Sequence, residues 1–505
     1  MNLTDEQAAY VDRYRAGGDL VVEAGAGTGK SSTLRAGAGA DSRDAALIAY
    51  NKSTADDAKR SMPRNVTAAT AHGWAYRAVG KRYRERMNNS ARQPSKVTAG
   101  ILAGLNRPAF EIGLDTGLHR NGLAQLTMRT LDAWCKSADQ HVLPKHVPDT
   151  PNLKGKSRDG AEIAAVLLAS TAWQDLQHDD RSGRGELPFE HNHYLKMWAL
   201  TRPRLPYDAV MWDEAQDANP VMVGVIEDQT HAQRVAVGDR CQAINGWNGA
   251  VDAMSVFAWE RLTLSRSFRF GPAVADLANL WLDALDAPLR LTGHDELDTV
   301  VGPCGEPDAI LCRGNVAAIV AADLELAAGR RVGMVGGTAD VKRLAFAAKD
   351  LIAGRPTDHP QLYLFGSWDD VREYAENEGS DLATFVRMID RFGPQWVLRI
   401  CAELVPETDA DVVTSTAHKA KGREWPRVLI AGDFPAPGDV KPDGEPLEFT
   451  KEDAMLAYVA VTRGREHLDP GGLAWIRHTR LRFNDKGVAV FDDDDDELEL
   501  DEGAA

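Results

Sequence analysis

A glycine-rich loop with a lysine and a serine is the first part of the sequence that could do chemistry. It has the sequence AGAGTGKS and runs from residue 24 to residue 31. Glycines let several backbone N–H groups point at one phosphate, the lysine supplies positive charge, and the hydroxyl is a ligand for Mg²⁺. We expect a nucleotide to bind at Ala24, Gly25, Ala26, Gly27, Thr28, Gly29, Lys30 and Ser31. The GKS at residues 155–157 lacks the upstream glycine, and a flexible loop explains it.

Two neighbouring carboxylates meet the second requirement of phosphate hydrolysis. Asp213 and Glu214 open the sequence DEAQD, directly after the apolar run AVMW at residues 209–212. One carboxylate has to hold Mg²⁺, and a second has to orient and deprotonate the attacking water. We expect Asp213 to bind the metal together with Ser31, and Glu214 to act as the base. Paired acids on a loop are ordinarily only solvated, but the buried strand before them favours a functional site.

Short apolar runs indicate which elements position these side chains. Residues 20–24 are expected to form a buried strand, followed by the glycine-rich turn and a helix that begins near Lys30. Other strands are expected at residues 209–212, 235–237, 309–313, 332–337, 411–415 and 427–433. Ligands of parallel α/β sheets bind at the carboxyl ends of the strands. The pattern predicts an α/β protein with two parallel sheets flanked by helices, and a helical insert at residues 83–180.

Length and composition indicate a multidomain protein without a membrane segment. At 505 residues the chain is expected to form several domains of roughly 150 residues each. Hydrophobic residues make up 44% of it, and no run approaches the ~18 apolar residues of a membrane span. The amino terminus lacks the features of a signal peptide, so we expect a cytoplasmic protein. The five cysteines show no paired spacing, and we predict neither a disulfide nor a structural metal.

Charge is distributed unevenly along the chain. The net charge of −17 argues weakly against a nucleic-acid partner, but nine acidic residues lie between Asp492 and Glu502. Such a stretch buries too little apolar surface to fold, so residues 491–505 are expected to be a disordered acidic tail. The tail could keep the protein solvated, dock a protein partner or mimic the charge of DNA. Residues 81–96 hold six basic residues against one acidic. They could follow a phosphate backbone or form a solvated helix face.

Further blocks resemble, in order, the motifs of UvrD/Rep-type superfamily 1 DNA helicases. They are LTDEQ (3–7), AYNKSTADDA (49–58), TAHGWA (70–75), GDRCQAINGWNGA (238–250), SRSFRFG (265–271), RGN (313–315), TAHKAKGREW (416–425) and YVAVTRGREHL (458–468). With the loop and the DEAQD sequence they cover nearly the whole chain. Within the family, residues 130–148 and 191–217 are most similar to the helicase part of F-box DNA helicases. No F-box fits before Gln7, so we expect the motor alone.

The resemblance implies an ATP and Mg²⁺ site between two RecA-like motor domains. The catalytic residues that it implies are Lys30, Asp213, Glu214, Gln242, Arg269 and Arg463. Gln7 would read the adenine edge, and Phe268 would stack on the adenine face. Gln242 would sense the γ-phosphate, and the two arginines would stabilise the developing charge from the two sides of the cleft. Glu424 would contact the ribose or link the site to the second domain.

The resemblance also implies a track for single-stranded DNA. The family stacks bases on aromatic side chains, which contributes roughly 1–3 kcal/mol per base and tolerates any base sequence. The DNA-binding residues implied here are Tyr50, His72, Trp247, Asn315 and His418. Asn245 and Asn248 stand where the family has a tyrosine and an arginine. These two departures predict a weaker DNA grip or weaker coupling.

The function implied is that of an ATP-dependent DNA helicase or translocase that moves 3′→5′ on single-stranded DNA and meets duplex junctions, in DNA repair, recombination or replication. An alternative is a DNA-stimulated ATPase that strips or remodels protein–DNA complexes without processive unwinding. A helicase–nuclease fusion is disfavoured, because too few residues follow Leu468. The expected domains are a first motor domain (1–82 and 181–262), a helical insert (83–180), a second motor domain (263–350 and 408–490), a short insert (351–407) and the acidic tail (491–505).

Overall fold

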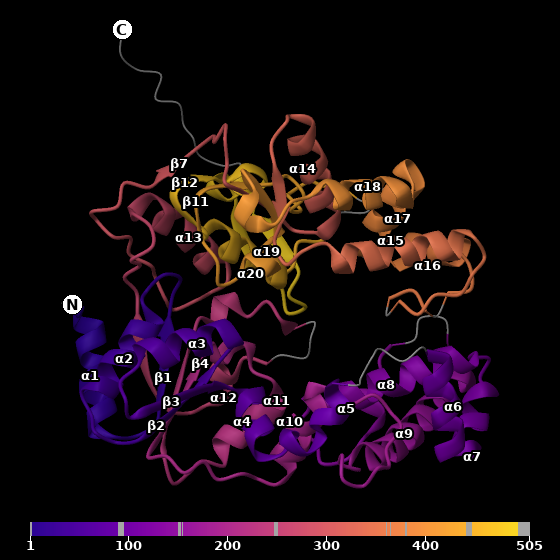
Figure 1. Ribbon diagram of the computed structural model, residues 1–505. Coiled ribbons are helices and arrows are strands. Elements are labelled where there is room, and N and C mark those ends of the chain that lie inside the picture. Colours follow the sequence, from indigo (N-terminus) through magenta and orange to yellow (C-terminus); the bar gives the residue numbers. More distant parts are fainter. Residues whose placement is uncertain are drawn as a thin grey trace.

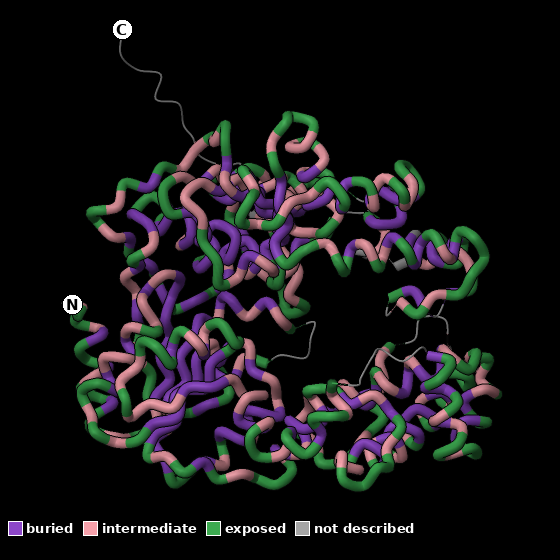
Figure 2. The backbone as a smooth tube through the Cα atoms, viewed as in Figure 1, coloured by how far each residue is buried: buried purple, intermediate pink, exposed green. Residues whose placement is uncertain are grey.

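Two six-stranded parallel sheets, each with helices on its faces, form the two halves of the molecule (Figure 1). The computed structural model describes residues 3–88, 95–149, 153, 155–246, 251–359, 361–363, 365–378, 381–440 and 447–492. Buried residues concentrate in the sheets and in the helices beside them (Figure 2). The predicted α/β fold with two parallel sheets is confirmed.

The first sheet carries the glycine-rich loop. Its strand order is β3-β2-β4-β5-β1-β6, and all neighbouring strands are parallel. The strands are β1 (Leu20–Ala24), β2 (Ala45–Ala49), β3 (Val66–Thr70), β4 (Ala209–Asp213), β5 (Gln233–Gly238) and β6 (Glu260–Leu264). β1, β2 and β4 are buried at every position, which explains their nearly continuous apolar sequences. Because parallel strands end at one edge, the segments after β1, β4 and β5 meet there.

Capping side chains fix where several helices of the first half begin. Thr4 and Gln7 form a capping box at the start of α1 (Asp5–Ala16), and Asn51 caps α3 (Lys52–Ser61). α2 (Lys30–Gly39) begins directly after the glycine-rich loop, as predicted. The remaining helices packed against this sheet are α4 (Ala71–Ala78), α11 (Pro220–Glu227) and α12 (Ala253–Val256).

The second sheet has the order β7-β12-β11-β8-β10-β9, again with all neighbours parallel. Its strands are β7 (Val300–Val301), β8 (Ala309–Cys312), β9 (Val332–Met334), β10 (Val412–Thr416), β11 (Trp425–Ile430) and β12 (Gly464–Asp469). The helices of this half are α13 (Pro272–Ala284), α14 (Asn315–Ala327), α15 (Ala339–Ile352), α19 (Ala417–Ala420) and α20 (Lys451–Val461). Residues 456–461 of α20 are all buried, so this helix lies inside the second half.

Two helical regions extend from the sheets and face one another in Figure 1. The first lies between β3 and β4 in the chain and contains α5 (Arg84–Asn88), α6 (Ser95–Leu105), α7 (Arg107–Leu114), α8 (Arg120–Lys136), α9 (Lys156–Leu176) and α10 (His191–Leu200). The second follows α15 and contains α16 (Trp368–Glu378), α17 (Asp381–Phe392) and α18 (Pro394–Glu403). The second region buries Val371, Ile389 and Ile400 in one core with Ile310 and Val412 of the second sheet.

A hairpin of β13 (Arg480–Phe483) and β14 (Ala489–Asp492) ends the described chain. Phe491 and Asp492, predicted as the first residues of the acidic tail, belong to β14 instead, because they pair with Leu481 and Arg480. The rest of the predicted tail lies outside the described residues. Short 3-10 helices lie at Gly80–Tyr83, Pro144–His146, Ala215–Asp217, Arg240–Gln242, Glu407–Asp409 and Gly471–His478. Among the described helices, none is long and apolar enough to cross a membrane.

Candidate active site

The glycine-rich loop contains two positions where only glycine fits. Gly27 and Gly29 have φ angles of 75° and 78°, which other residues rarely adopt. A Cβ atom on Gly27 would lie 2.5 Å from Ser267 Oγ and 2.7 Å from Arg269 Cβ. The loop therefore carries no side chain at Gly27 or Gly29, and it leads to the amino end of α2. Backbone N–H groups and the helix dipole attract anions at such an end. This cradle fits the phosphates of a nucleotide.

Lys30, Asp213 and Glu214 meet at the carboxyl edge of the first sheet. Lys30 Nζ lies 2.6 Å from Glu214 Oε1, and Asp213 is only 5% exposed. Burial opposes ionisation of Glu214, but the charges of Lys30 and Lys421 outweigh it and hold the pKa of Glu214 below its usual value. Burial and the neighbouring Glu214 raise the pKa of Asp213. Glu214 is therefore ionised, and its carboxylate is paired with Lys30.

The segment after β5 brings a third polar group to this edge. Asp239 is fully buried, and its carboxylate accepts hydrogen bonds from Gln242 Nε2 at 2.7 Å and from the Cys241 N–H at 3.1 Å. Gln242 Oε1 in turn accepts a bond from Arg463 Nη2 at 3.4 Å. Because Arg463 belongs to the second half, Gln242 lies where the two halves meet.

Arg269 and Arg463 converge on Thr462. Arg269 Nη1 donates to Thr462 O at 3.0 Å, and Arg463 Nη2 donates to Thr462 Oγ1 at 2.8 Å. Arg269 also forms an ion pair with Glu424, with 2.7 Å between Nε and Oε2. Burial, and then repulsion by Arg269, lower the pKa of Arg463 to about 9. An anion bound beside the two guanidinium groups would relieve this repulsion, which favours a phosphate at this place.

Gln7 and Phe268 flank Gly29 of the loop. A Cβ atom on Gly29 would lie 3.4 Å from Gln7 Nε2 and 3.6 Å from Phe268 Cδ2. The ring of Phe268 is accessible, because the residue is 43% exposed. The amide of Gln7 already accepts from the Thr4 N–H at 3.1 Å and donates to Thr33 Oγ1 at 3.2 Å. The structure therefore places both predicted adenine contacts beside the loop, with the Gln7 amide bonded within the protein.

The predicted DNA contacts follow the carboxyl ends of strands in both sheets. Tyr50 follows β2 and His72 follows β3, while Asn315 begins α14 after β8 and His418 lies in α19 after β10. Tyr50 is 48% exposed, and its Oη accepts from Asn245 Nδ2 at 3.2 Å. Trp247 and Asn248 lie outside the described residues. Four of the five predicted contacts are thus placed at equivalent edges of the two sheets.

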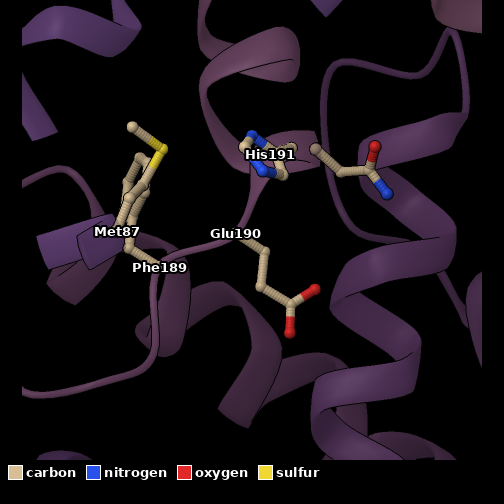
Figure 3. A pocket seen from close by; sticks show the side chains of 5 residues that line it. Met87, Phe189, Glu190 and His191 are labelled. Carbon is tan, nitrogen blue, oxygen red and sulfur yellow. The ribbon is translucent and has the colours of Figure 1, made fainter. Parts of the chain in front are cut away.

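A pocket of about 330 Å³ opens at the start of α10, near His72. Met87, Phe189, Glu190, His191 and Asn192 line it, and in Figure 3 Met87 and Phe189 lie on one side with His191 on the other. Asn192 Oδ1 lies 3.1 Å from His72 Nε2, and Asn192 Nδ2 donates to Asp132 Oδ1 at 2.8 Å. Burial lowers the pKa of His72. Burial therefore favours the neutral form of His72, and the hydrogen bonds of Asn192 link α4 to α8.

Comparison with known proteins identifies the family. The sequence model of the UvrD/REP helicase N-terminal domain matches residues 3–256, about half of the chain. The chain belongs to the UvrD/REP helicase family. The UvrD-like helicase C-terminal domain matches residues 367–469. UvrD-like helicases use ATP, which agrees with the phosphate cradle and with the residues gathered around Lys30.

Two relatives are F-box DNA helicases. The chain is 27% identical over 522 residues to F-box DNA helicase protein 1 of Schizosaccharomyces pombe, covering 92% of this chain and 57% of the relative. It is 28% identical over 513 residues to F-box DNA helicase 1 of Gallus gallus, covering 93% of this chain and 49% of the relative. The chain thus spans about half the length of these relatives, and their names agree with the sequence resemblance.

Two further residues of the helicase motifs lie between the halves and were not predicted from sequence. Lys421 Nζ of the second half pairs with Asp217 and donates to the carbonyl of Gln242. Tyr458 of α20 contacts the glycine-rich loop. Both residues lie in the sequence blocks that resemble family motifs, and this resemblance is the sequence feature that could have pointed to them. Their contacts depend on how the halves dock, and no local pattern shows that.

Proposed function

We propose that the protein is an ATP-dependent DNA helicase or translocase that moves 3′→5′ on single-stranded DNA. The proposal is supported chiefly by the contact region between the two halves, which we call the seam and which contains Gln242, Lys421 and Arg463. Lys30 and Glu214 pair at the carboxyl edge of the first sheet, and Arg463 of the second half contacts Gln242 of the first. A nucleotide bound at this seam would touch both halves, so its binding and hydrolysis would close and open them.

Each residue at the seam has a role in this proposal. Mg-ATP supplies, when bound, the phosphoanhydride whose hydrolysis drives movement. Lys30 holds the phosphates, while Ser31 and Asp213 bind the metal ion. Glu214 takes the proton of the attacking water, and the two arginines balance the charge that develops on the transferred phosphate. Gln242 touches one of these arginines and thereby senses the occupied site in both halves.

Single-stranded DNA is the proposed track, and it would lie along the carboxyl edges of the two sheets. The exposed ring of Tyr50 suits base stacking, and His72, Asn315 and His418 would add polar contacts. Family likeness adds Trp247. Family likeness also supports the 3′→5′ polarity and a role in DNA repair, recombination or replication. Duplex junctions, and a protein partner at the acidic tail, complete the proposed partners.

The domain bounds are part of the same proposal. The two motor domains would comprise residues 1–82 with 181–264, and 265–352 with 408–492, with inserts at 83–180 and 353–407. These bounds differ from those expected from sequence, because β6, α15 and β14 end at residues 264, 352 and 492. One observation favours the alternative of a DNA-stimulated ATPase that remodels protein–DNA complexes without processive unwinding. The helices α16 to α18 bury one face in a core that they share with the second sheet, so the described part of this insert forms no core of its own with which to grip a duplex.

Strand displacement from duplexes with a 3′ or a 5′ single-stranded tail tests the proposal, with ATP hydrolysis measured on the same DNA. Displacement that requires a 3′ tail and is absent in Glu214→Gln is the expected result. Displacement from a 5′ tail alone would contradict the polarity. DNA-stimulated hydrolysis without displacement would favour the remodelling ATPase, and no hydrolysis at all would overturn both functions.

A further inference from the structure

One tyrosine hydroxyl joins the second half to the glycine-rich loop. Tyr458 lies on α20 and is fully buried. Its Oη accepts a hydrogen bond from the Ala26 N–H at 3.2 Å and donates one to Asp239 Oδ2 at 3.0 Å. Ala26 and Asp239 belong to the first half, on the segments that follow β1 and β5. A single group of the second half thus holds two segments of the first.

The two partners of this hydroxyl belong to segments that the proposed chemistry uses. Ala26 precedes the two loop glycines with left-handed φ angles, and these glycines lead to Lys30. Asp239 orients Gln242 through the bond from Gln242 Nε2 at 2.7 Å. The position of α20 is therefore transmitted to the phosphate cradle and to Gln242 at the same time.

We propose that Tyr458 is a positioning residue that sets the glycine-rich loop and Gln242 when the two halves close. This inference rests on the proposed function, because it assigns a role within that nucleotide site. Tyr458 touches neither nucleotide nor metal in this role. It acts through the Ala26 N–H and the carboxylate of Asp239.

The chemistry of the contact requires a hydroxyl. An N–H group can only donate and an ionised carboxylate can only accept, so the group between them has to do both, as a tyrosine hydroxyl does. Burial, together with the charge of Asp239, raises the pKa of Tyr458 well above its usual value, so the hydroxyl keeps its proton. Phenylalanine at this position would fill the space but leave a buried donor and a buried acceptor without their partner.

The matched control is another buried tyrosine. Tyr10 of α1 is also fully buried, and its hydroxyl has no hydrogen-bond partner among the described residues. Tyr10→Phe removes the same atom from the same kind of environment without touching the seam. Tyr458→Phe and Tyr10→Phe therefore differ in the two hydrogen bonds at the nucleotide site.

Hydrogen exchange of the nucleotide-free protein tests the inference independently of catalysis. In Tyr458→Phe the peptide that spans residues 24–28 should exchange about tenfold faster than in wild type, because the Ala26 N–H loses its acceptor. Exchange in β4 should not change, and Tyr10→Phe should match wild type. Equal loop exchange in both variants would overturn the inference, and so would faster exchange spread over the whole first half.

Kinetics provide the second readout. The contact joins the two halves at the nucleotide site, so Tyr458→Phe should lower the DNA-stimulated kcat about tenfold and change the KM for ATP by less than about threefold. A loss confined to KM would contradict a role in closure. A wild-type protein that fails to hydrolyse ATP would refute the proposed function, while the exchange experiment would still decide whether Tyr458 holds the loop.

Discussion

Lys30 and Glu214 form one ion pair, yet replacing each should have a different result. Lys30→Ala removes the cation that balances phosphate charge, so ATP hydrolysis should fall at least about 100-fold. Glu214→Gln preserves shape but cannot take a proton, so ATP should bind while turnover stops. ATPase assays with single-stranded DNA and binding of a fluorescent ATP analogue measure the two effects. Lys59→Ala, which breaks a surface pair with Asp56, is the control. Native-rate hydrolysis by either site variant would refute the assignment.

Glu23 of β1 makes the stability of the first half depend on pH. Its side chain is 9% exposed, and burial raises its pKa from 4.5 to about 7, with Arg240 at 4.0 Å only partly opposing the shift. Between these two pH values the folded protein binds more protons than the unfolded chain. The stability that the folded protein gains from holding this proton on Glu23 is therefore complete below the pKa of Glu23 in the unfolded chain. It is lost as the pH rises through the pKa of Glu23 in the folded protein.

Glu23→Gln should remove this dependence, because an amide carries no charge to bury. The melting temperature should rise by about 3 °C or more at pH 8 and change little at pH 5. Differential scanning fluorimetry at the two pH values measures the difference. Glu260→Gln, at a half-exposed position, is the control. Equal shifts of the Glu23 variant at both pH values would show that the buried carboxyl does not cause the effect.

Among the elements, the glycine-rich loop tolerates change least. Gly27→Ala would place a methyl group 2.5 Å from Ser267 Oγ in a backbone with a φ of 75°, so both contact and conformation are unfavourable. Such strain costs about 1–3 kcal/mol, and kcat/KM for ATP should fall roughly 5- to 150-fold. Gly100→Ala in α6, where a Cβ atom meets open space, is the matched control. Unchanged kcat/KM for Gly27→Ala would mean that the loop rearranges freely.

Most central strands could be predicted because they are nearly continuous apolar runs. β2 was missed, although its sequence AALIA is a run of the same kind and is buried at every position. β1, β4 and β8 begin where the sequence placed them. β3 and β12 were not predicted, because VTAAT and GREHLD show neither a continuous apolar run nor strict alternation. β3 lies at a sheet edge, and β12 is covered on one side only by the two residues of β7. Edge positions impose less burial and leave a weaker pattern.

In the candidate site, the residues placed by a local sequence motif could be predicted, and the contacts between distant parts of the chain could not. Lys30 and Asp213 follow apolar strands within single motifs, so sequence alone indicated their place at one sheet edge. The contacts of Tyr458 with Ala26 and Asp239 join residues more than 200 positions apart. Their meeting depends on the docking of the two halves, which hydrophobic periodicity does not encode. Sequence resemblance placed Tyr458 within a motif but gave it no partner.

At the scale of the whole molecule, the short insert should limit unwinding. Its helices bury Val371, Ile389 and Ile400 in the core of the second half. We expect strong stimulation of ATP hydrolysis by single-stranded DNA but poor displacement of long duplexes by the protein alone. Single-turnover displacement of duplexes of increasing length, compared with stimulated hydrolysis, measures this difference. Efficient unwinding of long duplexes without a partner would show that the compact insert imposes no limit.

The halves also meet at a second joint, between α8 and the segment that follows α15 (Figure 1). Arg129 Nη1 donates to Tyr363 Oη at 3.4 Å, and its guanidinium lies 5.8 Å from the centre of that ring. Gln125 Nε2 donates to Asp358 O at 3.3 Å. These contacts are long and few, so the joint should open readily. A DNA strand held between the halves would be retained more firmly while the joint is closed.

Arg129→Ala should therefore release DNA faster without impairing the nucleotide site. An exposed cation–π contact contributes about 0.5–1 kcal/mol, so dissociation from single-stranded DNA should accelerate roughly two- to fivefold. The DNA-stimulated kcat should stay at the wild-type value. Arg120→Ala is the matched control, because it removes a cation–π contact with Phe110 inside the same helical region. Stopped-flow dissociation into excess competitor DNA compares the two variants, and equal rates would show that the joint does not retain DNA.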